Sequence, residues 1–370
     1  MSPYRVGYVG VEHHHRDPYF TIAAELPVDI VAVCEPGTPI GPDDLRPMED
    51  RPDEITEGGQ AALEVAQRAE FYADPAEMID SEDLDLLWIT YSNQETPEIV
   101  EHAVNAGLHV ISEKPIARTA SELASIANKA EDRGVSVVPT YFYRANPIVR
   151  ELRHRVQDGF FGDIWAIQGR FIGSQLSYRD TSHYIYDAGT SRGGVLQWIG
   201  VHWLDLMRHV LDSPIQRVNA SMAPARVTDV EEGAVVHFET ATGTMGTFHT
   251  GYYLEGTGKD TDLSLYGTAA QAWSPVHHDA TMNTPHAPLR ILSRRAGWES
   301  APERTIEYEF AYDTFPAWGD YVYRFFERSI DGLATNEPLA DISDAIAVLD
   351  ILDAAYASVD AEGWVTVSSR

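Results

Sequence analysis

The chain has 370 residues, of which 44% are hydrophobic, 57 are acidic and 27 are basic, so its formal net charge is -30. That charge repels phosphate backbones and anionic lipid headgroups, and we therefore expect neither nucleic acid nor a membrane surface as a partner. The chain has no apolar run near the ~20 residues that cross a bilayer, no basic-then-apolar leader and a single cysteine, Cys34. These features favour a soluble protein of the reducing cytoplasm.

Lysine is scarce in this sequence. Three of the 27 basic residues are lysine, at positions 114, 129 and 259, and the other 24 are arginine. A large acid surplus with few lysines favours a halophilic protein, because concentrated salt screens the repulsion between carboxylates. An ordinary acidic protein from a GC-rich genome is the alternative. In either case, a lysine that such a chain retains is a candidate for a functional role.

The first 142 residues alternate between strand-like and helical segments. A β-rich run covers residues 4–10, a helical stretch 18–26 and an apolar run 28–35, which together have the size of one βαβ unit. Residues 36–58, rich in Pro, Gly and Asp, are expected to form a long loop. The alternation continues with helix 60–69, a short strand near Phe71, strand 84–90, helix 96–106, strand 108–112, helix 119–133 and strand 135–140. Apolar strands between helices predict an α/β domain over residues 1–142, with a doubly wound parallel sheet.

The pattern changes near residue 143. A helix is expected over 147–157, a strand over 163–173 and a second helix over 200–211. Strand-like segments of alternating polarity follow at 214–222, 233–240, 243–254, 261–267 and 304–310, with a hairpin turn at 241–243. Consecutive strands with few helices predict an α+β domain with a mainly antiparallel sheet over residues 143–339. An amphipathic helix over 342–359 ends the pattern.

The loop after the first strand departs from the usual dinucleotide-binding pattern. That pattern is G-x-G-x-x-G, whereas this chain has Gly10-Val11-Glu12-His13-His14-His15 and keeps only the first glycine. The Glu12 carboxylate would repel a phosphate, so the loop alone is a weak signal. Glu35, at the end of the second strand, stands where an acid accepts hydrogen bonds from the ribose hydroxyls of NAD and repels the 2′-phosphate of NADP. Alternatively, Glu35 is an exposed loop acid.

The three consecutive histidines raise the question of a metal site. Adjacent side chains are expected to diverge, so at most His13 and His15 would converge on one ion, and the sequence offers no third ligand nearby. We therefore predict no metal site. We expect one histidine to donate a hydrogen bond to a phosphate and the others to be solvated.

Glu113-Lys114-Pro115 directly follows the strand at 108–112. This position is the carboxyl edge of the predicted parallel sheet, where doubly wound folds bind their ligands. Proline fixes the backbone beside the lysine, and a lysine partly shielded from water can hydrogen-bond a substrate hydroxyl or relay its proton. The alternative is a solvent-exposed lysine.

A second candidate segment runs from Gly193 to Asp205. Its glycine pair lets the backbone pass close to a ligand, and His202 lies near the start of the predicted helix 200–211. Histidine is the side chain best suited to accept a proton near neutral pH. Asp205 lies at i+3 on the same face, so His202 is alternatively a structural histidine tied to that carboxylate.

These segments together resemble the Gfo/Idh/MocA oxidoreductases, which are named after glucose-fructose oxidoreductase, inositol dehydrogenase and a rhizopine-catabolism protein. The likeness covers nearly the whole chain and rests on VGYVG, VAVCE, AGLHVISEKPIA, GFFGDI, GGVLQWIGVHWLD and ILDAAYASVDAEGWVTV. It implies a Rossmann domain followed by a domain with an open antiparallel sheet, and a C-terminal helix, 340–360, that packs back on the Rossmann domain. It also implies a homodimer or homotetramer formed through that sheet.

The resemblance implies a role for individual residues. Lys114 matches the family's catalytic lysine and His202 its catalytic histidine. The residues expected near the cofactor are Gly10, Val11, Glu12, His13, Glu35, Ser92, Asn93, Glu113, Lys114 and Pro115. Those expected near the substrate are Lys114, Tyr143, Arg144, Gln197, Trp198 and His202, with the loop 173–190. Arg144 would suit a carboxylated sugar, although a surface ion pair explains it equally well.

One departure from the family lies four residues before His202. Many members carry a catalytic aspartate there, and this chain has Trp198. Separation by four would place both side chains on one helix face. An indole accepts no proton but can cover the C–H side of a sugar ring. Alternatively, Trp198 belongs to the core.

The expected activity is that of an NAD-dependent dehydrogenase, with NADP a less favoured cofactor. Its substrate would be a sugar, polyol, cyclitol or sugar acid, with a CH–OH group as the reacting centre. Two alternatives remain open: a non-catalytic nucleotide or sugar sensor on the same scaffold, and a redox-neutral enzyme that uses tightly bound NAD.

Overall fold

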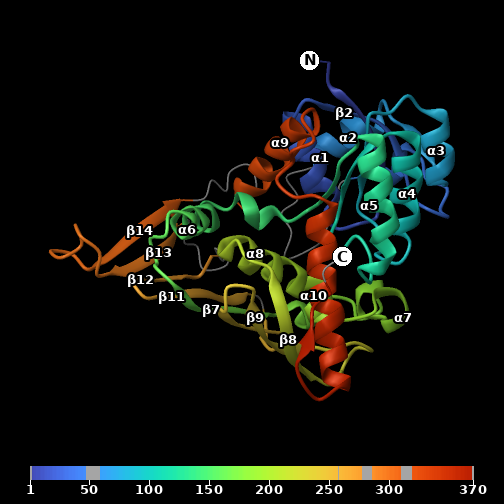
Figure 1. Ribbon diagram of the computed structural model, residues 1–370. Helices are drawn as coiled ribbons and strands as arrows, with labels where there is room; N and C mark the ends of the chain where they lie inside the picture. Colours follow the sequence, from blue (N-terminus) through green and yellow to red (C-terminus); the bar gives the residue numbers. More distant parts are fainter. Residues whose placement is uncertain (1, 47–58, 257, 277–285, 310–318, 369–370) are drawn as a thin grey trace. The chain divides into compact units, whose positions relative to one another are not determined.

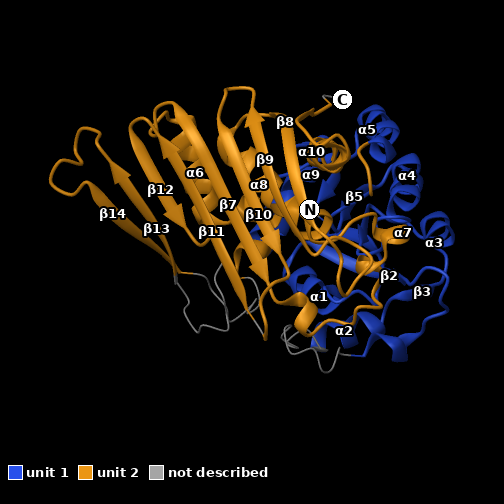
Figure 2. Cartoon of the chain, turned by 90° about the horizontal axis from the view of Figure 1, so that it is seen from below, with its two compact units in different colours: residues 1–117, 121–140, 323–345 blue, residues 118–120, 141–322, 346–370 orange. Residues whose placement is uncertain are grey.

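The computed structural model describes residues 2–46, 59–256, 258–276, 286–309 and 319–368. The chain divides into two compact units (Figure 2). Unit 1 comprises residues 1–117, 121–140 and 323–345, and unit 2 comprises residues 118–120, 141–322 and 346–370. None of the described helices is both long enough and apolar enough to span a lipid bilayer.

Unit 1, whose residues 1–117 run from blue to blue-green in Figure 1, is built on a parallel sheet. Its strand order is β3-β2-β1-β4-β5-β6. Its strands are β1 (Tyr4–Val9), β2 (Val28–Cys34), β3 (Glu70–Tyr72), β4 (Leu86–Ile89), β5 (His109–Ser112) and β6 (Val137–Pro139). This order is that of a Rossmann fold, so the predicted doubly wound domain is confirmed. The chain moves outward from β1 to β3 and then returns to β4 beside β1. The carboxyl ends of β1 and β4 therefore meet where the winding direction reverses.

The helices of unit 1 cover both faces of this sheet. They are α1 (Arg16–Glu25), the 3₁₀ turn η1 (Pro42–Leu45), α2 (Gly59–Ala66), α3 (Pro75–Ser81), α4 (Thr96–Ala106), α5 (Ser121–Arg133) and most of α9 (Tyr321–Leu333). Because β-α-β crossovers are right-handed and the two halves wind in opposite directions, α1 and α4 pack on opposite faces. Of the predicted loop 36–58, residues 47–58 lie outside the described residues.

Unit 2 contains a mixed sheet with strand order β14-β13-β12-β11-β7-β10-β9-β8-β15. Its strands are β7 (Ile164–Gly173), β8 (Ile215–Ala223), β9 (Gly233–Thr240), β10 (Met245–Gly251), β11 (Lys259–Gly267), β12 (Ala270–Ser274), β13 (His286–Ser293), β14 (Glu303–Glu309) and β15 (Val365–Thr366). Neighbouring strands are antiparallel except β7 and β10, which pair in parallel. The predicted α+β domain with a mainly antiparallel sheet, and the hairpin between β9 and β10, are confirmed.

Helices cover one face of this sheet, as Figure 2 shows for α6 (Pro147–Gln157) and α8 (Val201–Leu211). The indole of Trp203 on α8 stacks on Phe248 of β10, with ring centroids 5.7 Å apart. Gly169 on β7 permits this close approach, because a Cβ there would lie 3.0 Å from Met207 and 3.1 Å from Trp203. The other described helical segments are the turns η2 (Phe142–Ala145), η3 (Gln175–Ser177) and η4 (Tyr184–Tyr186), α7 (Ala188–Ser191), the π-helical turn η5 (Leu196–Gly200) and α10 (Ile342–Asp360).

Both units contain part of the C-terminal region. Residues 323–333 of α9 belong to unit 1, whereas α10 is divided, with 342–345 in unit 1 and 346–360 in unit 2. Within unit 2, Ser358 of α10 accepts a hydrogen bond from the backbone of β8, and β15 then adds to the edge of that strand. Most of α10 is therefore part of unit 2.

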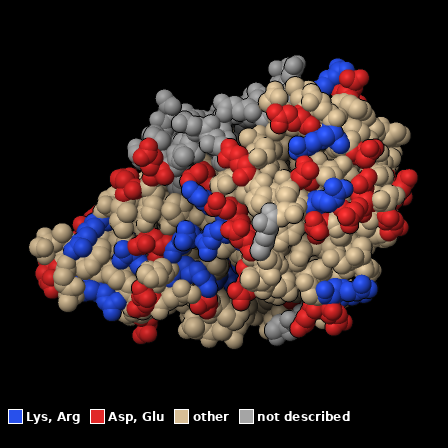
Figure 3. Space-filling view, turned by 90° about the horizontal axis from the view of Figure 1, so that it is seen from above, with Lys and Arg blue, Asp and Glu red and all other residues tan. Residues whose placement is uncertain are grey.

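The acidic surplus is distributed over the surface. On the face shown in Figure 3, Asp and Glu side chains lie among the Lys and Arg side chains. Several arginines form exposed ion pairs, such as Arg170 with Asp260 and Arg290 with Glu303. Exposed pairs of this kind contribute little to stability individually.

Candidate active site

Four loops at the carboxyl edge of the parallel sheet carry the residues predicted to lie near the cofactor. They follow β2, β1, β4 and β5, which are neighbours in that order. Hydrogen bonds link them: the backbone N–H of Glu12 donates to Glu35 at 3.1 Å, the Thr90 hydroxyl donates to the carbonyl oxygen of Gly10 at 2.8 Å, and the ring of His15 bonds Glu113 at 3.0 Å. Residues from distant parts of the sequence thus lie together within unit 1.

The turn after β1 requires glycine at position 10. Gly10 has φ = 89°, in the left-handed region, and a Cβ there would lie 2.1 Å from the carbonyl oxygen of Thr90 on the neighbouring β4 loop. A side chain at this first position of the dinucleotide-binding pattern would therefore collide with the backbone of the β4 loop, so the position requires glycine. Val11, which follows it, is buried, whereas Glu12 is exposed.

Glu35 is a buried acid rather than an exposed loop residue. Burial raises the pKa of its carboxyl group to about 7, although backbone hydrogen bonds from Glu12 and Val11 act in the opposite direction. The Glu35 side chain therefore connects the end of β2 to the first turn after β1 by accepting the hydrogen bond from the backbone of Glu12.

This raised pKa makes a testable prediction about stability. An unfolded glutamate has a pKa of about 4.3, so between about pH 4.3 and 7 the folded state binds more protons and stability falls as the pH rises. Glu35→Gln keeps a hydrogen-bond acceptor without the charge. We expect the variant to match the wild type at pH 5 and to unfold at a higher temperature at pH 8. The expected difference is at least the ~2–4 °C that 1 kcal/mol produces in domains of this size.

Thermal unfolding followed by circular dichroism at both pH values measures this difference. Glu70→Gln, at an exposed position on neighbouring β3, is the control and should show no pH-dependent difference. Equal melting temperatures of wild type and Glu35→Gln at pH 8 would contradict the prediction.

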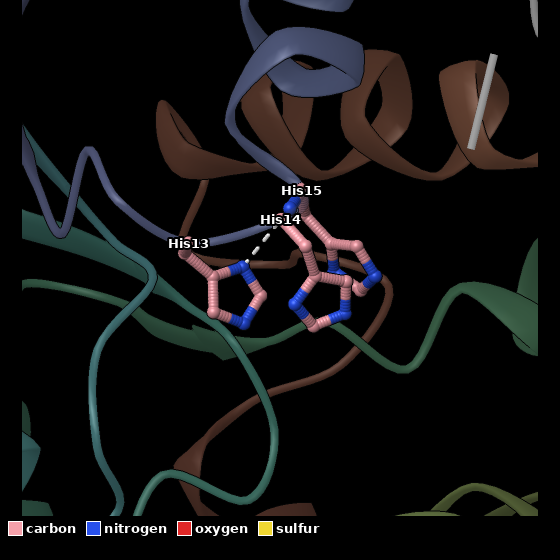
Figure 4. A group of neighbouring side chains, drawn as sticks. All are labelled: His13, His14 and His15. Atoms are coloured by element: carbon pink, nitrogen blue, oxygen red, sulfur yellow. Dashed lines mark hydrogen bonds between the residues drawn. The ribbon is translucent and has the colours of Figure 1, made fainter. Parts of the chain in front are cut away.

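The histidine rings converge instead of diverging. The ring centroids of His13, His14 and His15 lie 4.1–4.9 Å apart, and Figure 4 shows the three rings side by side. The expectation that adjacent side chains would diverge is wrong here because the loop turns into α1 at this point, with His15 at the N-cap. His15 is also buried, which contradicts the expectation of a solvated ring.

Glu113 is the centre of a buried network that includes the candidate lysine. One carboxylate oxygen accepts hydrogen bonds from the His15 ring and the Tyr19 hydroxyl, and the other accepts one from the backbone N–H of Lys114 at 3.0 Å. Burial alone would raise the pKa of Glu113, but the charge and hydrogen bond of His15 and the charge of Lys114 hold it well below its ordinary value. Sequence reasoning missed Tyr19, although it lies one helical turn after His15.

Lys114 is buried and held at the end of β5. Its backbone N–H also lies 3.2 Å from the hydroxyl of Thr140, and its peptide bond to Pro115 is cis. The alternative of a solvent-exposed lysine is therefore wrong, since the residue is 9% exposed. Ser92 and Asn93, after β4, are buried as well, and the carbonyl oxygen of Ser92 accepts a hydrogen bond from the hydroxyl of Thr96, the first residue of α4.

In unit 2, the buried ring of His202 packs among aromatic side chains. Its centroid lies 4.6 Å from that of Phe142 and 5.4 Å from that of Tyr143, which it meets edge-on. Burial raises the pKa of the Tyr143 phenol, so that group stays protonated and able to donate a hydrogen bond near neutral pH. The turn at 142–145 and the start of α8 thus place the Tyr143 phenol beside the His202 imidazole.

A π-helical turn at 196–200 precedes His202. Its hydrogen bonds run from i to i+5, so Trp198 and His202 do not share the α-helical register that their spacing suggested. The Trp198 indole N–H donates to Ser191 at 2.7 Å, and the ring packs with Ile185 and Val230. Trp198 is therefore a core residue of unit 2. The side chain of Gln197 is also buried and donates to the backbone oxygen of Arg118.

Arg144 forms a buried ion pair instead of a surface one. Two of its guanidinium nitrogens donate to the two carboxylate oxygens of Asp205, at 2.9 and 2.5 Å. Both side chains are almost fully buried, and Arg208 adds a third charge 3.7 Å from the same carboxylate. This pair ties the turn that carries Tyr143 to the helix that carries His202.

Two sequence models of one protein family match the chain. The model described as an oxidoreductase family NAD-binding Rossmann fold matches residues 53–141, and the model of the GFO/IDH/MocA C-terminal domain matches residues 149–272. Together they cover more than half of the chain, and each agrees with the unit observed in the structure. The chain belongs to the Gfo/Idh/MocA oxidoreductase family.

Curated relatives of this Gfo/Idh/MocA protein include levoglucosan dehydrogenase of Pseudarthrobacter phenanthrenivorans, 27% identical over 179 residues, which are 45% of this chain and 44% of the relative. Inositol 2-dehydrogenase of Salmonella typhimurium is 24% identical over 243 residues, 64% of this chain and 62% of the relative. The matched segments thus span about half of the relatives' length.

The fold of the Gfo/Idh/MocA protein is also found among solved structures. A levoglucosan dehydrogenase in complex with NADH and L-sorbose has a TM-score of 0.79 at 18% identity, and the match covers the whole of both chains. At that identity the likeness establishes the two-domain fold, and the chemistry has to be argued from this chain's own residues.

Proposed function

We propose that this protein is an NAD-dependent dehydrogenase that oxidises a CH–OH group of a sugar, polyol, cyclitol or sugar acid. The proposal rests above all on the buried Lys114, held by Glu113 and Thr140 at the carboxyl edge of a Rossmann sheet. The family membership supports it, as does the buried imidazole of His202 beside Tyr143 in unit 2.

The residues at the carboxyl edge of the sheet fit NAD. The buried Glu35 carboxyl group at the end of β2 suits the ribose hydroxyls and opposes a 2′-phosphate, so NAD is favoured over NADP. Gly10, Val11, Glu12 and His13 would lie along the phosphates, and Ser92, Asn93, Glu113 and Pro115 towards the nicotinamide end. When bound, NAD supplies the acceptor for the hydride.

The chain's own residues would manage the substrate oxygen and its proton. The Lys114 side chain donates a hydrogen bond to the reacting hydroxyl oxygen, which stabilises negative charge as the O–H bond breaks. The His202 ring would accept that proton, and bound NAD would take up the hydride from the same carbon, which would become a carbonyl. The Tyr143 hydroxyl orients the substrate. Arg144 acts by fixing Tyr143 and His202 relative to each other, because its guanidinium is paired with Asp205.

A substrate panel tests this proposal. Purified protein is mixed with sugars, polyols, cyclitols and sugar acids and with NAD or NADP, and NADH formation is followed by its absorbance. We expect net reduction with at least one substrate and higher kcat/KM with NAD than with NADP. An absence of turnover together with an absence of NAD binding would remove the dehydrogenase assignment.

A non-catalytic sensor is a second candidate. Two observations favour it: Glu12 stands where the family pattern has a glycine, and Trp198, where many members carry an aspartate, is packed into the core. The same assay separates the possibilities. Net NADH accumulation indicates a dehydrogenase, transient reduction a redox-neutral enzyme with tightly bound NAD, and ligand binding without turnover a sensor.

We also propose a setting for the protein: the cytoplasm of a halophile, as a homodimer or homotetramer formed through the open sheet. The 57 acidic residues against 27 basic ones and the three lysines support the halophilic origin. The panel is therefore run at low salt and at about 1 M KCl, where the Debye length is about 3 Å and carboxylate repulsion is screened.

A further inference from the structure

The histidine triplet is a compact group of nitrogen ligands. Each of His13, His14 and His15 offers a ring nitrogen, and these three atoms lie within 4.8 Å of one another. In a tetrahedral zinc site, with Zn–N distances of about 2.0–2.1 Å, ligand nitrogens are about 3.3 Å apart. Each nitrogen would need to move inward by no more than about 1 Å to reach that geometry. The rings lie side by side in Figure 4, and rotation about the Cα–Cβ and Cβ–Cγ bonds can move a ring nitrogen by this amount.

His15 is oriented as a metal ligand usually is. Its Nδ1 bonds Glu113 at 3.0 Å, and because an ionised carboxylate only accepts, Nδ1 must be the donor. A neutral ring then carries its lone pair on Nε2. Ligating histidines commonly donate their other N–H to a carboxylate, which fixes the tautomer and increases the basicity of the ligand. The Tyr19 hydroxyl also donates to Glu113 and holds that carboxylate in place.

His13 contributes to the cluster through its backbone contact. Its Nδ1 accepts a hydrogen bond from the backbone N–H of His15 at 3.1 Å, which folds the loop so that the rings meet. This bond assigns the lone pair of the neutral ring to Nδ1, so coordination through Nδ1 replaces one hydrogen bond with one metal bond. His13 and His14 are half-buried, which leaves a side of the cluster accessible to solvent.

We infer that His13, His14 and His15 form a binding site for one Zn²⁺ ion, with Glu113 as the carboxylate that orients His15. Imidazole nitrogen is a ligand that zinc prefers. Three protein ligands leave the fourth position of the tetrahedron for water or another oxygen ligand. The strong negative charge of the whole chain favours the capture of a dication. The inference goes beyond the proposed dehydrogenase activity and does not depend on it.

Zinc binding to the protein without cofactor tests this inference. The protein is treated with a chelator, incubated with Zn²⁺, gel-filtered and analysed for metal. We expect one equivalent of Zn²⁺ in the wild type and its loss in His15→Gln. Glu113→Gln should bind Zn²⁺ about 10–100-fold more weakly in a calorimetric titration, the usual effect of removing a carboxylate partner.

The control is His102→Gln, which changes an exposed histidine that pairs with Asp80. This variant should keep the full equivalent. Because His15 is buried and its variant can lose structure, His14→Gln serves as a second test at a half-buried position, with circular dichroism to verify folding. Equal zinc content in folded His14→Gln, His15→Gln and the wild type, or no zinc in the wild type, would overturn the inference.

Discussion

Replacing Lys114 with methionine is expected to lower kcat by about 10²-fold or more, the usual contribution of a positioned acid–base group. Methionine keeps an unbranched, flexible side chain and so preserves much of the packing of this buried position, but it removes the ammonium group that would polarise the substrate oxygen. The effect should appear in kcat and kcat/KM together, because the interaction is strongest in the transition state. NAD affinity, measured by fluorescence titration, should change much less.

The chain offers a matched control for this experiment. Lys129 is half-exposed on α5 and forms an ion pair with Glu101 on α4, so Lys129→Met removes a lysine that takes no part in the candidate site. Its turnover should stay at the wild-type level. Wild-type turnover in Lys114→Met would remove this residue from the mechanism. A parallel His202→Asn variant tests the role of the imidazole in the same way.

The architecture was largely predictable because its sequence signals are local. The boundaries of α6 agree with the prediction because Asn146 caps its first turn and Pro147 occupies the first helical position, as helix N-termini favour. Strand β9 was recognised by its alternating polarity and by the short turn at 241–243.

Helix α9 was missed although its apolar residues have helical spacing. Val322, Phe325, Phe326 and Ile330 recur at intervals of three and four, but aromatic and β-branched residues are typical of strands and weak helix formers. Tertiary packing decides its conformation: Phe326 contacts Tyr19 and Trp88 in the core of unit 1. The sequence analysis also missed α3, β12, β13 and β15. These elements are shorter, and their conformation likewise depends on packing against neighbouring elements.

Which loops lie together in unit 1 could be predicted from the sequence, whereas the orientation of each side chain could not. Sheet topology determines which strand ends are neighbours, so the proximity of the loops after β1 and β5 followed from the βαβ pattern. The direction of each ring in the loop at 13–15 depends on local backbone angles and on Glu113, 98 residues away. In the same way, the spacing of Trp198 and His202 was interpreted with α-helical geometry, which the π-helical turn at 196–200 does not follow.

The largest expected effect on stability comes from the buried ion pair of unit 2. Asp205→Ala leaves the Arg144 guanidinium buried without its bidentate partner, and breaking such a pair costs about 3–5 kcal/mol. At about 2–4 °C per kcal/mol, the unfolding transition should fall by about 6–20 °C. The exposed pair between Arg170 and Asp260 gives the comparison: Asp260→Ala should cost less than about 1 kcal/mol.

A double variant distinguishes the pair's net contribution from the cost of leaving one charge alone. Replacing both members by apolar residues of similar size, Arg144→Met with Asp205→Leu, removes the buried charges together and should recover most of the lost stability. Because the pair joins the Tyr143 turn to the His202 helix, this stable variant should still show reduced kcat. A double variant as unstable as Asp205→Ala would mean that Arg144 and Asp205 stabilise unit 2 through contacts other than their mutual charge.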